Sequence, residues 1–584
     1  MTLQEQMTQT VQKAFAECGF EASFGRVNLS NRPDLCEYQC NGAMAAAKQV
    51  HKNPMEIAEA VAARLSEDPL FDSVLAVRPG FINLNASAEA AANALEQIRA
   101  DEKLGVQPIG GGKTAILDYG GANVAKPLHV GHLRSAIIGE SLKRLYRFMG
   151  YEAIGDVHLG DWGLQMGLII EAVKDEQPDL PYFDESFTGA YPAEAPFTIS
   201  DLETIYPAAS ARAKKDEAFS ARAHEATFRL QQGDRGYTAL FQHVLNVSKA
   251  DLKKNYDALD VHFELWKGES DVQPYIADML AGFEKQGILK ESEGARVIEV
   301  ARPDDTKEVP PCLVQKSDGA YLYATTDLAT IVEREKLYRP AEYCYITDKR
   351  QNMHFEQVFR AAKLTHLVPE ERRLFHLGFG TMNGKDGKPF KTRSGGVLRL
   401  EYLLKDVKEA VYERMAETDL PEEEKQQTAA VIGLAALKYG DLSNQATKDY
   451  VFDLERFSSF EGNTGPYILY TIVRIRSILR KAAEQGIGAG KILPAAGPGE
   501  KELQLQLGRV AQTVTEAFSE KAPHKLCQFL YELSNDFNAF YRDNHILKEE
   551  DAARQSAWIA LLELTERELI TLCHLLGFDA PERM

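Results

Sequence analysis

The most constraining feature of this chain is a short apolar run at 115–117 that leads through a loop into the pattern of a helix start. The run predicts a buried strand. Apolar residues then recur at helical spacing from Leu133 to Phe148, and Gly150 stands where a C-terminal cap is expected. A strand that feeds directly into a helix is the first half of a βαβ unit, so a parallel sheet covered by helices is predicted.

Two histidines, His129 and His132, flank Gly131 in the first turn of the predicted helix. The first turn of a helix has unpaired N–H groups and the positive end of the helix dipole, so it stabilises an anion such as a phosphate. The same spacing also occurs in zinc sites. However, the nearest cysteines are Cys40 and Cys312, which leaves the pair without the usual further ligands. We therefore expect no protein-bound structural metal. Taken alone, the pair is as typical of two exposed histidines near a helix cap as of a phosphate site, so the rest of the chain must decide between them.

The 584 residues exceed what one hydrophobic core supports, and length alone predicts about three to four domains. With 67 Lys and Arg against 86 Asp and Glu, the formal charge of −19 disfavours indiscriminate binding of nucleic acid, although local basic faces remain possible. No long apolar run or signal peptide is found, and the seven cysteines are scattered. We expect a cytoplasmic protein that is not bound to a membrane.

The pattern changes along the chain predict three domains. The predicted fold class is α/β, a doubly wound parallel sheet of the Rossmann type with an N-terminal α+β domain and a C-terminal all-α bundle. Strands at 295–300 and 343–346 are expected to continue the α/β pattern, and one alanine-rich helix is expected over 43–65. The domains are an α+β unit at 1–106, the α/β domain at 107–400 with an insertion near 175–265, and a helical domain at 401–584.

A second element suited to phosphates lies near the end of the α/β domain, at 384–396. Its glycines make a loop that can move, and its lysines and arginine can neutralise a departing pyrophosphate. Taken alone, such a segment is more often a basic surface turn. Because it occurs in the same domain as the histidine pair, a phosphate-binding loop is favoured over a basic surface turn.

Together these two elements resemble the paired signatures of class I aminoacyl-tRNA synthetases, known as HIGH and KMSKS. The first is His-Val-Gly-His at 129–132, and the second is only loosely present at 388–394, where Lys391 takes the catalytic place. The divergent second loop, the stretch 123–135, and the motif Leu-Gly-Asp-Trp-Gly at 159–163 resemble arginyl-tRNA synthetases in particular. The resemblance covers nearly the whole chain.

The resemblance implies an enzyme that activates L-arginine with Mg-ATP and transfers the arginyl group to the 3′-terminal ribose of its tRNA. His129, His132, Lys126 and Lys391 are then the catalytic residues. Main-chain and side-chain contacts to ATP are expected from Ala122, Asn123, Val124, Ala125, Pro127, Leu128, Val130, Gly131, Lys388, Arg393 and Ser394.

Selecting a guanidinium over an ammonium calls for carboxylates placed for bidentate hydrogen bonds. The resemblance assigns this role to Glu152 and Asp327, with Tyr323 and Gln351 beside them and Asn123 near the α-amino or carboxylate end. Many members of the family carry asparagine where this chain has a valine at 157. There we expect the histidine at 158 or a main-chain group to make the contact.

The outer domains are expected to hold the tRNA. The N-terminal domain resembles the one that touches the tRNA elbow, and the helical domain resembles an anticodon-binding domain, in which aromatic side chains stack on unpaired bases. The expected tRNA contacts are Tyr470, Arg474, Tyr541 and Met584. The chain is expected to act as a monomer.

Two alternatives differ in class. One is another adenylate-forming nucleotidyl transferase with the same sheet, which leaves the helical domain unexplained. The other is a tRNA-binding relative without catalysis, which is disfavoured because both histidines and Lys391 are present.

Overall fold

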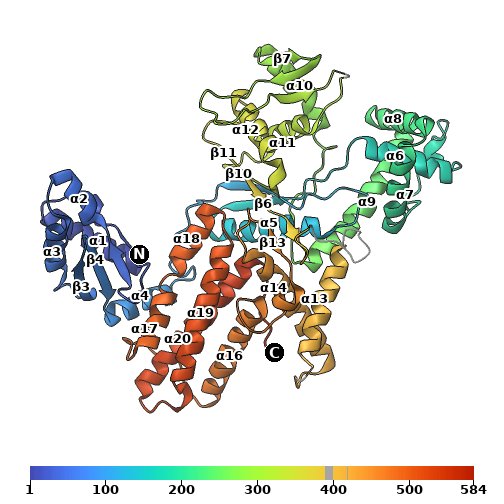
Figure 1. Cartoon of the computed structure of the whole chain (residues 1–584). Helices are drawn as coiled ribbons and strands as arrows, with labels where there is room; N and C mark the ends of the chain where they lie inside the picture. The colour runs from blue at the N-terminus through green and yellow to red at the C-terminus, as the bar shows by residue number, and fades with distance from the viewer. Residues whose placement is uncertain (318, 389–398, 417) are drawn as a thin grey trace.

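The computed structural model describes residues 1–317, 319–388, 399–416 and 418–584. The N-terminal domain stands apart from the rest of the molecule and joins it through α4 (Figure 1). Its antiparallel sheet has the strand order β1-β2-β4-β3. Its elements are α1 (Leu3–Glu17), η1 (Ala22–Phe24), β1 (Val27–Leu29), β2 (Tyr38–Cys40), α2 (Gly42–Val50), α3 (Pro54–Leu65), β3 (Phe71–Val77), β4 (Phe81–Ala86) and α4 (Ala88–Ala100).

The single helix expected over 43–65 is wrong, because two helices, α2 and α3, occupy this stretch. His51 takes a left-handed conformation with φ of 54° at the end of α2, and Pro54 begins α3. Proline lacks the N–H that a helix interior needs but suits the first helical position, so it separates the two helices.

A four-stranded parallel sheet forms the centre of the molecule, with the order β11-β10-β5-β6. The predicted βαβ unit is confirmed as β5 (Thr114–Asp118), α5 (Val130–Phe148) and β6 (Glu152–Asp156), and Gly150 has the positive φ of a helix end. Chain order reverses between β5 and β10 (Glu342–Asp348), which creates a switch point where ligands bind beyond the carboxyl ends of the strands. The fourth strand is β11 (Arg373–Phe379).

A smaller antiparallel sheet, β7-β8-β9, lies outside the central one. The strand expected at 295–300 is β8 and belongs here, so its assignment to the main α/β pattern is wrong. Its pairing partners, not its own residues, decide this. The elements of this lobe are α10 (Gln273–Lys285), β7 (Leu289–Ser292), β8 (Ala295–Ile298), β9 (Cys312–Gln315), α11 (Tyr323–Leu337), η3 (Lys349–Gln351) and α12 (Asn352–Leu364).

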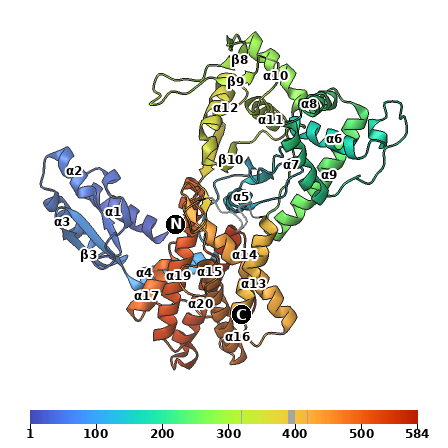
Figure 2. The ribbon, with the colours of Figure 1, turned by 45° about the vertical axis from the view of Figure 1, so that its right-hand side comes forward.

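The expected insertion near 175–265 is helical and projects to one side of the sheet (Figures 1 and 2). It packs on α6, with Phe219 and Ala223 among the buried residues between these helices. Its elements, with the preceding helix, are α6 (Leu164–Glu176), η2 (Pro181–Phe183), α7 (Ile199–Ala213), α8 (Glu217–Gln231) and α9 (Arg235–Ala258).

The C-terminal part is mostly helical, as predicted. Helix α5 packs against α14 and α20, so the helix that carries the histidines shares one core with the C-terminal helices. The elements are β12 (Met382–Asn383), α13 (Leu400–Arg414), α14 (Glu422–Leu442), β13 (Tyr450–Val451), α15 (Leu454–Phe457), α16 (Gly465–Glu484), α17 (Pro498–Leu507), α18 (Val510–Glu520), α19 (His524–Asp543), η4 (Ile546–Lys548) and α20 (Ala552–Leu576).

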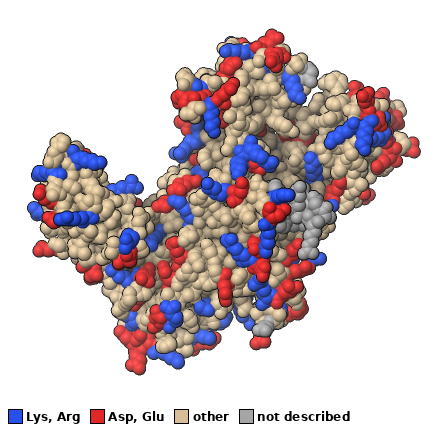
Figure 3. Space-filling model, in the orientation of Figure 1, with Lys and Arg blue, Asp and Glu red and all other residues tan. Residues whose placement is uncertain are grey.

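Within the described ranges, no helix combines the length and apolar character needed to cross a membrane. Acidic and basic side chains are interspersed over the face in Figure 3, and no continuous basic surface covers it.

Candidate functional site

The histidine pair is held by hydrogen bonds within the first turn of α5. Nδ1 of His129 accepts from the N–H of Gly131 at 3.0 Å, and Nδ1 of His132 accepts from the N–H of His129 at 3.2 Å. The two ring centroids are 3.9 Å apart. A Cβ at Gly131 would lie 2.7 Å from Cε1 of His129, so only glycine leaves room for this ring.

Both histidine rings are neutral at physiological pH. Burial, and then the charge of Lys126, lower the pKa of His129; burial, and then His129, lower the pKa of His132 to about 3. Because each Nδ1 accepts a hydrogen bond, the single ring proton of each histidine resides on Nε2. The turn therefore offers two Nε2–H donors without two buried positive charges.

The loop between β5 and α5 is fastened to a neighbouring loop. Asn123 bridges to Gly160, and the N–H of Val124 donates to the carbonyl of Gly160 at 3.1 Å. A Cβ at Gly160 would lie 2.4 Å from Oδ1 of Asn123, so any side chain there would displace the Asn123 amide. Five of the residues predicted to contact ATP are buried: Ala122, Val124, Ala125, Leu128 and Val130.

The root of the lysine loop lies beside the histidine turn. Strand β12 pairs in parallel with β13, Arg399 bridges to His129, and the N–H of Leu400 donates to the carbonyl of Leu128 at 3.0 Å. Lys388 is exposed. The other predicted loop residues, Lys391, Arg393 and Ser394, lie outside the described residues.

The predicted arginine-binding residues approach the same edge of the sheet from α11 and η3. Tyr323 and Asp327 lie one turn apart on α11, and the side chain of Tyr323 is 73% exposed. Oδ2 of Asp327 lies 2.5 Å from Nε2 of His354. Gln351, also exposed, follows β10 at its carboxyl end.

Glu152 is not brought into this group. It begins β6, opposite Thr114 at the start of β5, and is exposed. The other residues gather at the carboxyl ends of the strands, whereas Glu152 marks the amino end. The expectation that it lies beside Asp327 is therefore corrected by the direction of the strand.

The carboxylate of Glu269, which the sequence analysis missed, lies near that of Asp327. Its N–H donates to the carbonyl of Leu159 at 3.1 Å. Burial, assisted by the carboxylates of Asp161 and Asp327 and opposed by His158, raises the pKa of Glu269 to about 7. The only local signal was the polar stretch Lys-Gly-Glu-Ser-Asp at 267–271, which has no distinctive spacing.

A buried charge cluster lies at the ends of β5 and β6. Nη2 of Arg334 donates to Oδ2 of Asp118 at 2.6 Å and to Oδ2 of Asp156 at 2.7 Å. Burial opposes protonation of His158, but Asp118 and Asp156 outweigh it and the pKa of His158 is raised. Asp118, Asp156 and His158 are close enough to share a metal ion, but the guanidinium already supplies the compensating charge.

Val157, where an asparagine was expected in the family, is fully buried, and its N–H donates to the carbonyl of Leu265 at 3.2 Å. Its side chain therefore has no access to a ligand. The next residue, His158, has a polar side chain at the end of this strand. It is one of the two groups that were expected to replace the family asparagine.

The four predicted tRNA contacts lie together on the helical domain. The guanidinium of Arg474 lies 4.7 Å from the ring centroid of Tyr470 and 5.8 Å from that of Tyr541, and these two residues are 43% and 38% exposed. Tyr470, Arg474, Met584 and Asn538 line one pocket. Exposed rings around an oriented guanidinium can hold an unstacked base.

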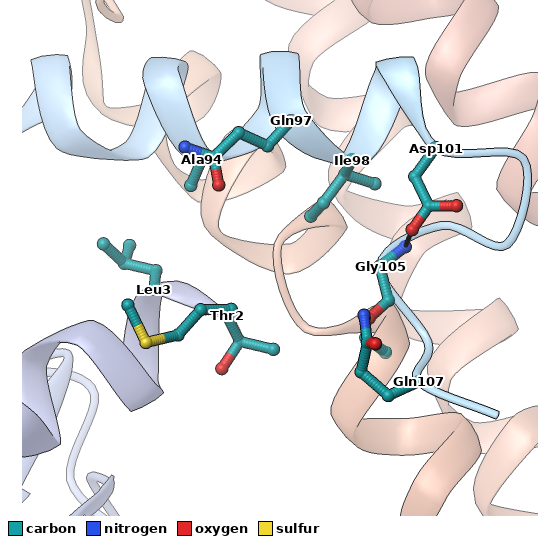
Figure 4. Close-up of a pocket in the computed structure, with 10 residues that line it drawn as sticks. Thr2, Leu3, Ala94, Gln97, Ile98, Asp101, Gly105 and Gln107 are labelled. Atoms are coloured by element: carbon teal, nitrogen blue, oxygen red, sulfur yellow. Dashed lines mark hydrogen bonds between the residues drawn. The ribbon is translucent and has the colours of Figure 1, made fainter. Parts of the chain in front are cut away.

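Another pocket lies between the start of α1 and the end of α4, and Ala511 of α18 also lines it (Figure 4). Thr2 and Leu3 line it on one side, and Ile98, Asp101 and Gln107 on the other. None of its lining residues is among those predicted for catalysis or binding. It is a junction between domains.

Comparison with known families decides the relationship. The family model of class I (R) tRNA synthetase catalytic domains matches residues 94–454, that of arginyl tRNA synthetase N-terminal domains matches 1–86, and that of DALR anticodon-binding domains matches 468–584. The chain belongs to the arginyl-tRNA synthetase family. The predicted fold class and the predicted class of enzyme, a ligase that forms aminoacyl-tRNA, are thereby confirmed, and ATP is a substrate of this class.

Relatives cover the chain from end to end. It is 55% identical over 99% of both chains to an arginine–tRNA ligase of Agathobacter rectalis, and 52% identical over 99% of both chains to one of Alkaliphilus oremlandii. The crystal structure of arginyl-tRNA synthetase from Plasmodium falciparum aligns with a TM-score of 0.82 at 25% identity, covering 100% of this chain and 99% of that one.

Proposed function

We propose that this chain is an arginine–tRNA ligase whose first step joins L-arginine to AMP at the carboxyl edge of the central sheet. The arginine carboxylate attacks the α-phosphorus of Mg-ATP, the bond to the β-phosphate breaks, and pyrophosphate leaves. A ribose hydroxyl at the tRNA 3′ end then attacks the arginyl carbonyl, and AMP leaves. Neither step needs a protein nucleophile, so positioning and charge stabilisation carry the catalysis.

The observation that carries the proposal is the pair of imidazoles at the start of α5 whose Nδ1 atoms accept from main-chain N–H groups, which leaves Nε2 of each neutral ring as a donor. Their donors face the charge that develops on the α-phosphate, and a preorganised donor of this kind contributes about 10²- to 10³-fold in rate. Lys126, beside the pair, and Lys391 neutralise the departing pyrophosphate. Mg²⁺ enters with ATP as part of the substrate.

Specificity for arginine is assigned to Glu269 and Asp327, with Tyr323, Gln351 and Asn123 around them. A guanidinium presents its donors in a planar fork and stays charged, so it can pair with both carboxylates. An uncharged side chain in the same place would leave the carboxylates without a partner. Binding of the substrate guanidinium restores ionisation of Glu269, which burial disfavours in the free protein.

For the tRNA, we assign the anticodon to the surface formed by Tyr470, Arg474, Tyr541 and Met584, and the elbow to the N-terminal domain. The three domains assigned from the sequence, 1–106, 107–400 and 401–584, each then have a role. We further propose that the chain acts as a monomer, and sedimentation of the purified protein tests this. The seven cysteines, all free, support a reducing compartment such as the cytoplasm.

Arginine-dependent exchange of pyrophosphate into ATP, measured with and without tRNA specific for arginine, tests the proposal. We expect exchange with arginine and tRNA together. Exchange with a different amino acid would contradict the assignment and favour another adenylate-forming enzyme. No exchange with any tRNA, despite tight tRNA binding, would favour a tRNA-binding relative without catalysis.

A further inference from the structure

The insertion at 175–265 contacts the ATP site through α7. Glu203 and Tyr206 are three residues apart on this helix, so they share one face. The Lys126 ammonium lies 4.8 Å from the centroid of the Tyr206 ring, and the Glu203 carboxylate binds the guanidinium of Arg399.

A second helix of the insertion, α9, supports the same loop. Oγ of Ser248, which is buried, accepts from the N–H of Ala125 at 2.9 Å. Ala125 has φ of 57°, a conformation that costs energy for a residue with a Cβ. Because Ala125 directly precedes Lys126, this bond helps to set where the lysine side chain begins.

The partner of Lys126 has a chemical consequence. A carboxylate would hold the ammonium but neutralise it, whereas the face of an aromatic ring orients the ammonium and leaves its full charge available. A lysine held in this way loses less rotamer freedom when a phosphate binds.

The second contact of α7 is the ion pair between Glu203 and Arg399. Arg399 follows the segment that contains Lys391, and it bridges to His129. Glu203 therefore ties the end of that segment to the helix that also orients Lys126.

We propose that the insertion is a positioning element for the ATP phosphates, with Tyr206 orienting Lys126 and Glu203 holding Arg399 against the histidine turn. Both are positioning residues, since they act through other side chains. The inference rests on the proposed function, because it assumes that Lys126 works on the phosphates of ATP.

The test is arginine-dependent pyrophosphate exchange with tRNA present, with kcat and KM for ATP measured for Tyr206→Leu and Tyr206→Phe. Loss of the ring should lower kcat/KM for ATP about 2- to 30-fold, the range that cation–π contacts span. Phenylalanine keeps the ring face and should remain near wild type. Thr204→Ala, on an exposed position of the same helix, is the matched control.

A double-mutant cycle identifies the route of the effect. In a Lys126→Ala background, Tyr206→Leu should cause no further loss of kcat/KM, although any loss of thermal stability should persist. Should Tyr206→Leu fold poorly, Tyr206→Met removes the ring with an unbranched side chain. In the same way, Glu203→Gln should lower kcat/KM for ATP in the wild type and not in an Arg399→Ala background.

The inference is overturned by wild-type exchange in Tyr206→Leu, by an equal loss in Tyr206→Phe, or by an undiminished loss in the Lys126→Ala background. Lys126→Ala and His132→Ala, run alongside, report on the proposed function itself. Full activity in both variants would refute the proposed function. Strongly reduced activity in both, together with wild-type activity in Tyr206→Leu, would refute only the positioning role.

Discussion

Replacing His132 by asparagine and, separately, by glutamine divides the two roles of its ring. In the structure Nδ1 accepts from the N–H of His129, so the proton of the neutral ring belongs on Nε2. The amide of asparagine lies where Nδ1 is, and the amide of glutamine reaches the place of Nε2. His132→Asn therefore keeps an acceptor for the helix start and loses the donor, and His132→Gln does the reverse.

The expected magnitudes differ in kind. Loss of the donor in His132→Asn should lower the exchange rate about 10²- to 10³-fold, as for other preorganised donors to developing negative charge. Loss of the capping bond should cost about 0.5–1 kcal/mol in His132→Gln, the lower part of the usual range. We place it there because the bond, at 3.2 Å, is long.

Three measurements on each variant are needed: the pyrophosphate exchange rate, the affinity for tRNA by filter binding, and the midpoint of urea unfolding. We expect His132→Asn to be slow but stable, and His132→Gln to be faster than His132→Asn but less stable. Both should bind tRNA as the wild type does. A slow and unstable His132→Gln beside an active His132→Asn would refute the donor role and leave the histidine a purely structural one.

The remaining predictions concern other parts of the site. Glu269→Gln should raise KM for arginine about 10- to 100-fold, because a charged acceptor is lost, whereas the same change at the exposed Glu152 should leave KM unchanged; equal KM values for the two variants would contradict the assignment. Tyr470→Ala should weaken tRNA binding about 5- to 100-fold in a filter assay, the value of one stacked base, with KM for arginine unaffected; unchanged binding would place the anticodon elsewhere. The free energy of unfolding should fall as the pH drops from about 6.5 toward 3, because His132, with a native pKa of about 3, stays neutral in the folded chain while its unfolded counterpart binds a proton. In His132→Asn, the free energy of unfolding measured with urea should fall less between pH 7 and pH 5 than in the wild type. An equal fall in both proteins would refute this.

Local order was largely predictable from the sequence. The strand β5, the helix α5 and its end at Gly150 follow from apolar periodicity and a terminal glycine, which act over a few residues. The same holds for the long helices of the C-terminal domain. The break within 43–65 is also a local feature, since Pro54 favours the first position of a helix.

Strand partnership could not be predicted in this way. The residues of β8 suit any sheet, and only its neighbours β7 and β9 place it outside the central one. Likewise, the exposed Glu152 and the half-buried Glu269 are both acidic residues near strand-like segments. Which of them reaches the arginine site depends on the direction of β6 and on the return of the chain beside Leu159.

By itself, then, the sequence determined the histidine turn, its helix and the family to which the chain is similar, because capping, periodicity and motif spacing are properties of neighbouring residues. Only the tertiary structure decided that Glu269 stands beside Asp327, that Arg334 neutralises Asp118 and Asp156, and that Tyr206 faces Lys126. These contacts join residues far apart in the chain. They form when separate elements pack against a common core, and no local pattern records which elements will meet.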